Sequence, residues 1–163
     1  KKGHGDYWLI HMAQHHRARD VMTEVHWDNH NYFIHYGGAG LNMFHMVGYD
    51  PDHDNKFKQQ SELGFEFDDV AREASITALM AQMPRLIYAH DEGTSFGELF
   101  TKTCNTTPAS AAIYRDAIEK LLEEKVIEVI SVEGIHRRSG QQIKPTDQIL
   151  SARQRGFFFF DGA

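Results

Sequence analysis

The segment SFGELFTKTCNTTPASAAIYRDAIEKLLEEK, residues 95–125, determines the fold class, because it contains two helix signals separated by a short polar turn. Ser95 and Glu98 are spaced as in a capping box, which predicts the start of a short helix. The longer helix is predicted to follow the turn, with Thr107 as its cap and Pro108 at its first position. Two helices joined so closely must cross sharply, as they do in a helix-turn-helix.

The flanking segments extend this motif to a winged helix-turn-helix. Asp68 is placed to cap an upstream helix, which Pro84 is expected to kink or end. Downstream, residues 126–132 predict a strand and residues 153–160 its returning partner, with a loop of about 20 residues between them. This order of elements assigns residues 63–163 to a winged helix.

Residues 1–62 have a different character. The aromatic and apolar segment 6–13 predicts a buried strand, and residues 15–28 predict an amphipathic helix that packs back on it. The apolar residues of this helix fall at helical spacing: Ala18, Val21, Met22 and Val25. They are expected to pack with Trp8 and Ile10 against residues 32–49. The polar stretch 50–62 marks the domain boundary. The predicted fold class is therefore α+β, with a small α/β remnant of strand, helix and strands before the winged helix.

Composition narrows the range of functions. The chain has 163 residues, of which 41% are hydrophobic and 25% charged, as in globular proteins. No apolar run is long enough to cross a membrane. A single cysteine excludes an internal disulfide framework and favours a reducing, cytoplasmic location. The first residue is Lys1, and we expect the chain to be a piece of a longer protein.

Charge gives an ambiguous answer on nucleic-acid binding. In a winged helix the second helix of the pair would enter the major groove. Its outward residues are expected to be Ser110, Ala111 or Tyr114, Arg115, Glu119 and Lys120. The same helix carries four acids that repel phosphate: Asp116, Glu119, Glu123 and Glu124. Arg115 is the basic candidate on this helix.

The wing is the more basic part. Residues 134–160 contain one acid, Asp147, and five basic residues: Arg137, Arg138, Lys144, Arg153 and Arg155. A local cluster of this kind binds phosphates even on an acidic protein. DNA or RNA is therefore one predicted partner, and the alternative is a winged helix used for protein contacts or dimerisation.

Two further patterns offer weak sites. His26 and His30 are four residues apart, the spacing of two zinc ligands on one helix face, but the following asparagines indicate that the helix ends there. Gly38 and Gly40 belong to a glycine-rich turn that would let a nucleotide cofactor approach the backbone. The dinucleotide fingerprint fails at Met43. Hydrogen-bonded histidines and an ordinary turn are the simpler interpretations.

The chain resembles the C-terminal region of the three-Cys-motif partner protein family. One resemblance is the stretch DYWLIHMAQHHRARDVMTEVHW, residues 6–27. Further matching stretches lie in the second half, and they are Ser95–Glu98, Tyr114–Ile118, Leu121–Lys125 and Arg137–Gly140. The resemblance covers most of the chain, although its motifs consist mainly of hydrophobic spacing.

The resemblance implies a methyltransferase-like role. Such proteins look like methyltransferases of Rossmann-like fold that use S-adenosylmethionine and carry a terminal winged helix. Residues 1–62 would then be the end of that domain, with the cofactor loop upstream and no cofactor in this chain. The implied partner is a three-Cys-motif protein that resembles radical-S-adenosylmethionine enzymes. No catalytic residue is carried over, because the matched positions are structural.

Two alternatives remain open. In one, the chain is itself an enzyme that binds S-adenosylmethionine through residues 37–40. In the other, it is a module for dimerisation or protein interaction. A homo-oligomer would cover the sheet edge left by missing upstream strands. No membrane partner is expected.

Overall fold

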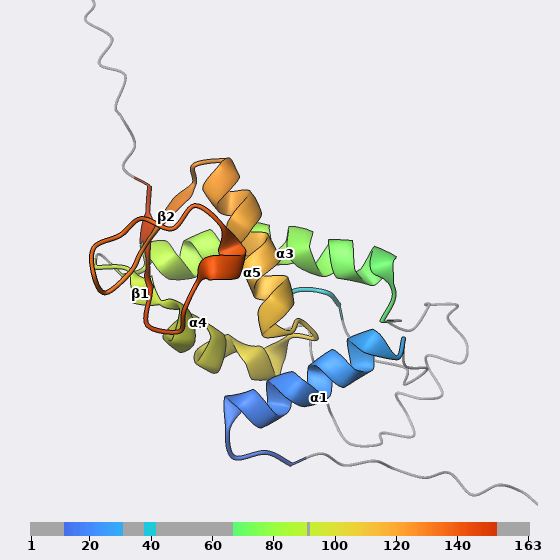
Figure 1. Ribbon diagram of the computed structural model, residues 1–163. Coiled ribbons are helices and arrows are strands. Elements are labelled where there is room, and N and C mark those ends of the chain that lie inside the picture. Colours follow the sequence, from blue (N-terminus) through green and yellow to red (C-terminus); the bar gives the residue numbers. More distant parts are fainter. Residues whose placement is uncertain (1–11, 31–37, 42–66, 91, 153–163) are drawn as a thin grey trace, which may run out of the picture.

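The computed structural model describes residues 12–30, 38–41, 67–90 and 92–152, and they form an assembly of helices with a small antiparallel sheet (Figure 1). The elements in chain order are α1 (His16–Asp28), α3 (Asp69–Tyr88), β1 (Thr94–Ser95), α4 (Phe96–Thr103), η1 (Cys104–Thr106), α5 (Ala111–Glu123), β2 (Ile127–Ile130), η2 (Gly140–Gln142) and β3 (Gln148–Ser151). The α+β class is confirmed. From α3 onward, this is the order of a winged helix-turn-helix.

The sheet has the strand order β1-β3-β2, with both pairs antiparallel. Ile127 pairs with Ser151 and Ile130 with Gln148, so the returning strand is β3. The prediction of a returning strand at residues 153–160 was wrong in position. Ile149 of β3 pairs with Val129 of β2, and both side chains are buried in the core. The loop between β2 and β3, residues 131–147, is called the wing below. Residues 153–160 lie outside the described part of the chain.

Helices α3 and α5 form the centre of the core. Ile76, Leu79 and Met83 of α3 recur at helical spacing and are buried. They share one apolar cluster with residues of α5. Pro84 lies inside α3, and the helix continues to Tyr88, so the proline does not end it.

The helix starts were predicted with mixed success. The capping box of Ser95 and Glu98 is present at α4, and the Asp68 carboxylate accepts a hydrogen bond from the Ala71 amide at the start of α3. The predicted start of α5 was wrong by three residues, because its N-cap is Ser110 rather than Thr107. Thr107 instead turns the chain, and its hydroxyl accepts a hydrogen bond from the Ala109 amide.

Helix α1 has the predicted extent but packs with a different face. Val21 and Val25 are exposed, whereas Thr23 is buried and Trp27 packs against the core cluster. The helix lies across α4 and the start of α5, below them in Figure 1. The predicted strands at 6–13 and 32–36, and the boundary at 50–62, lie outside the described residues. None of the helices in the described ranges combines the length and the apolarity that a membrane crossing requires.

Candidate interaction surface of the winged helix

Helix α5 occupies the position of a recognition helix, yet other parts of the chain cover most of its surface. From Ala111 to Leu122 each residue is buried or half-buried, and exposure begins only at Glu123. Ser110, Ala111 and Tyr114 were expected to point outward, and this prediction was wrong. Tyr114 is fully buried, and its hydroxyl lies 2.8 Å from the Thr103 hydroxyl. Burial raises the pKa of Tyr114, so the phenol stays protonated.

The wing covers one side of α5 through η2. A Cβ atom added at Gly140 would lie 2.1 Å from the backbone oxygen of Arg115, so only glycine permits this approach. The Ser139 hydroxyl donates a hydrogen bond to the Glu119 carboxylate at 3.2 Å. These contacts place the wing on the face that a base-reading helix would present to a groove.

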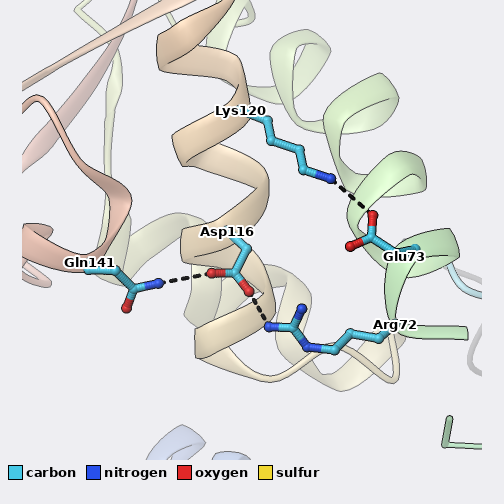
Figure 2. Close-up of polar contacts among 5 residues, drawn as sticks. All are labelled: Arg72, Glu73, Asp116, Lys120 and Gln141. Carbon is cyan, nitrogen blue, oxygen red and sulfur yellow. Dashed lines mark hydrogen bonds and ion pairs between the residues drawn. The ribbon is translucent and has the colours of Figure 1, made fainter. Parts of the chain in front are cut away.

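A second polar cluster joins α3, α5 and the wing (Figure 2). Asp116 accepts hydrogen bonds from the Arg72 guanidinium of α3 and, at 2.9 Å, from the Gln141 amide of the wing. One turn further along α5, Lys120 pairs with Glu73 at 3.0 Å. The polar side of α5 therefore faces other parts of the same chain.

Helix α1 covers the N-terminal end of α5. The Arg19 guanidinium donates to the backbone oxygen of Thr107 and, at 3.0 Å, to that of Ala109. The Asp20 carboxylate accepts from the Ala111 amide at 2.7 Å, and Ser110 makes no side-chain cap of its own. Asp20 thus caps α5 from another helix.

The remaining contacts of α1 are also directed at the helix-turn-helix. The Trp27 indole donates to the Pro108 backbone oxygen at 2.9 Å, and His16 packs edge-on against Phe100. Burial lowers the pKa of Arg19, and burial also raises the pKa of the nearby Cys104 thiol. The interface is therefore a desolvated one, built largely from hydrogen bonds to backbone groups of the turn.

The predicted phosphate-binding residues have different environments. Arg137 forms an ion pair with buried Asp147 at 2.8 Å, so this arginine supports the wing and is not a free cation. Arg115 is half-buried with its guanidinium 5.1 Å from the centre of the Phe96 ring. Arg138 and Lys144 are exposed on the wing. Arg153 and Arg155 lie outside the described residues.

The candidate metal ligands, His26 and His30, both contact Phe67. His26 lies on α1 and stacks on Phe67 at 5.5 Å, whereas His30 follows the helix with a positive φ and contacts the Phe67 backbone oxygen. No group of three or more metal-ligating side chains occurs among the described residues.

The candidate cofactor turn lies against α3. Gly40 is buried, and a Cβ atom there would lie 2.7 Å from the Gln82 side-chain amide. The amide of the next residue, Leu41, donates to Gln82 at 2.6 Å. Gly38 precedes this contact and is half-buried. The close approach to Gln82 gives Gly40 a packing role.

The comparison with protein families decides the classification. Residues 48–134, more than half of the chain, match the model of the GMT-like wHTH domain. The chain belongs to this family. The matched segment includes α3, α4 and α5, whereas α1 and β3 lie outside it. No curated protein and no solved structure gives a significant match.

Proposed function

We propose that this winged helix is a protein-docking module, which uses its helix-turn-helix surface to hold a helix instead of DNA. The observation that carries the proposal is the coverage of α5, in which every residue from Ala111 to Leu122 is buried or half-buried. Its N-terminal end, which enters the major groove in DNA-binding relatives of the motif, contacts α1 instead.

The chemistry of α5 also favours protein docking. Readout of bases needs side chains that reach base edges with donors and acceptors. The first turn of α5 offers Ala111, Ala112 and Ile113, which have no polar side-chain atoms. The acids further along, Asp116 and Glu119, would repel phosphate and are held by contacts within the chain.

The docked helix suggests how the module is used. The resemblance of residues 6–27 to three-Cys-motif partner proteins supports the proposal that α1 belongs to the end of a methyltransferase-type domain. By binding α1, the winged helix would then hold the methyltransferase-type domain in place. It would also help to present that domain to the three-Cys-motif protein. S-adenosylmethionine would be the cofactor of the whole protein, bound by a part of that methyltransferase-type domain upstream of α1.

A second candidate is phosphate binding by the wing. It rests on Arg138 and Lys144, which are exposed side chains on the same loop. Two cations give a weak electrostatic contact. Each neutralised phosphate contributes about −0.9 to the slope of the logarithm of the binding constant against the logarithm of the salt concentration.

Fluorescence anisotropy with a labelled duplex of about 20 base pairs, and with a single strand, distinguishes the two functions across a salt series. The docking proposal predicts no saturable binding at low salt. Salt-sensitive binding that is lost in R138E/K144E, and kept in a matched K102E variant on α4, would establish the wing as a nucleic-acid contact. Binding that is lost in R115E would show that α5 reads nucleic acid and would overturn the docking proposal.

A further inference from the structure

Helix α1 carries an apolar stripe on the side turned away from the winged helix. Its members recur at positions i, i+3, i+4 and i+7, and they are Ala18, Val21, Met22 and Val25. At about 100° per residue, this stripe lies opposite Arg19, Thr23 and Trp27, which face the winged helix. Val21 is 53% exposed and Val25 is 43% exposed. The docked helix therefore has a second face that the described part of the chain does not cover.

We propose that this stripe is a self-association surface, on which the α1 helices of two copies of the chain pack antiparallel around a two-fold axis. The axis would pass near Val21 and Met22, so that Ala18 of one copy meets Val25 of the partner subunit. Spacing of this kind is typical of a short helix–helix seam. A two-fold interface uses the same patch on both copies, as this stripe permits.

The charges beside the stripe favour a second copy in this orientation. Arg17 and Glu24 are seven residues apart and flank the same edge of the stripe. Among the described residues neither side chain forms an ion pair. An antiparallel arrangement places Arg17 opposite Glu24 of the partner subunit, and it does so twice. In a parallel arrangement this edge would face the opposite edge of the partner helix, so Arg17 and Glu24 of the two copies would not meet.

The surroundings of Glu24 agree with this pairing. Partial burial raises its pKa first, the like charges of Asp20 and Asp28 raise it further, and the nearby Arg115 lowers it in part. A second cation beside Glu24 would relieve the remaining repulsion. Arg17 of the partner subunit is the group that the antiparallel geometry supplies.

The size of the stripe sets the expected strength. Stable interfaces bury about 1,600 Å² in total, and a seam of four residues per copy is smaller. We therefore expect a reversible dimer whose population changes over about a hundredfold range of protein concentration.

Sedimentation velocity of the full chain over that range tests the proposal. The expected result is a monomer–dimer equilibrium that V21E abolishes. V70E is the matched control, because Val70 is 77% exposed on α3 and should leave the equilibrium unchanged. A wild-type chain that is monomeric at every concentration would overturn the proposal. The stripe would then be covered by another segment of the chain or by another protein.

A charge exchange tests the orientation. R17E and E24R each oppose like charges twice in the antiparallel pair, so each should weaken the dimer by about tenfold. The double variant R17E/E24R restores both pairs and should return the dissociation constant to the wild-type value. Single variants without effect, or a double variant that is weaker than both, would overturn the antiparallel arrangement. These readouts do not depend on nucleic-acid binding, so they are independent of the proposed function.

Discussion

Helices α1 and α5 have the same length of thirteen residues but opposite relations to the rest of the molecule. Helix α5 is enclosed by α3, the wing and α1, and its apolar residues lie in the core. Helix α1 docks through Arg19, Asp20 and Trp27 while its aliphatic stripe faces outward. This contrast shows that an apolar face identifies the buried side of a helix only when its neighbour is apolar. Where the neighbour is a turn with free backbone carbonyl groups, the polar side of the helix packs against it and donates hydrogen bonds to those groups.

Truncation of one aliphatic side chain in each helix should show this contrast most strongly. Ile118 of α5 is fully buried, so Ile118→Ala removes packed volume and should lower the free energy of unfolding by about 2–5 kcal/mol. Val21→Ala in α1 should change it by less than about 0.5 kcal/mol in dilute solution. Urea denaturation followed by circular dichroism measures both. Equal losses would mean that the outward face of α1 is buried in solution.

The enclosure of α5 by the wing should be the next most sensitive feature. Gly140→Ala pushes a methyl group against the backbone of Arg115, and we expect a loss of about 2–3 kcal/mol. Gly134→Ala is the control, because no atom lies within 4 Å of the added Cβ and the substitution therefore causes no clash. Its φ of +80° is unfavourable for alanine. This control should show only the conformational strain, about 1 kcal/mol. A Gly140→Ala protein as stable as the Gly134→Ala protein would mean that the wing does not pack tightly on α5.

The docking of α1 can be disrupted at a single side chain. Arg19→Ala leaves the buried carbonyl groups of Thr107 and Ala109 without their donor, which should weaken docking by about 2 kcal/mol. Hydrogen exchange should then show faster exchange in α1 and at the Ala111 amide, with the α3–α5 core still protected. Arg17→Ala is the matched control at an exposed position of the same helix, and both variants are compared at a protein concentration below that of the proposed dimer. If both variants exchange alike, the contacts of Arg19 do not hold α1.

Much of the winged helix could be predicted from the sequence, because its signals are local. The capping box at Ser95 and the cap at Asp68 involve residues only three positions apart. The buried apolar residues of α3 and α5 recur at helical spacing, which is also a signal between near neighbours in the sequence. The position of β3 was missed, because pairing depends on how the wing folds on α5, which is a contact between distant segments.

The interaction surface was harder to predict, since its decisive bonds join residues about ninety positions apart. The neighbours Arg19 and Asp20 lie on the polar side of an amphipathic pattern, where solvent exposure is the usual expectation. Ser110 is the N-cap residue of α5 but forms no side-chain cap, and the Asp20 carboxylate of α1 accepts the hydrogen bond from Ala111 instead. The sequence gives no sign of this substitution. Arg137 was predicted to be among the basic residues available to bind phosphate, and the sequence could not show that it forms an ion pair with Asp147.

The wing that encloses α5 should respond to pH through Asp147. Burial raises the pKa of this carboxyl group, but hydrogen bonds from Arg137 and from the Lys144 amide outweigh it and lower the pKa overall. A lowered folded-state pKa means that the carboxylate stabilises the fold above the unfolded value of 3.8, and that this stability is lost as the pH falls through the folded value. Asp147→Asn should therefore cost about 1–2 kcal/mol at pH 7. The difference from wild type should narrow in urea titrations near pH 3, and a constant difference would contradict this account.

The smallest effect is expected where α5 meets α3 at the surface. Glu73 and Lys120 form an ion pair whose side chains are 62% and 42% exposed, so water and salt screen it. Glu73→Gln should lower the free energy of unfolding by less than about 0.5 kcal/mol. Asp116→Asn one turn away should cost more, because Asp116 is 21% exposed and joins Arg72 of α3 to Gln141 of the wing (Figure 2). Urea titrations at low and high salt separate the two, since screening removes the Glu73 effect and leaves most of the Asp116 effect. If Glu73→Gln proved as costly as Asp116→Asn, α5 would owe its position to charge pairs at its surface rather than to enclosure by the wing and α1.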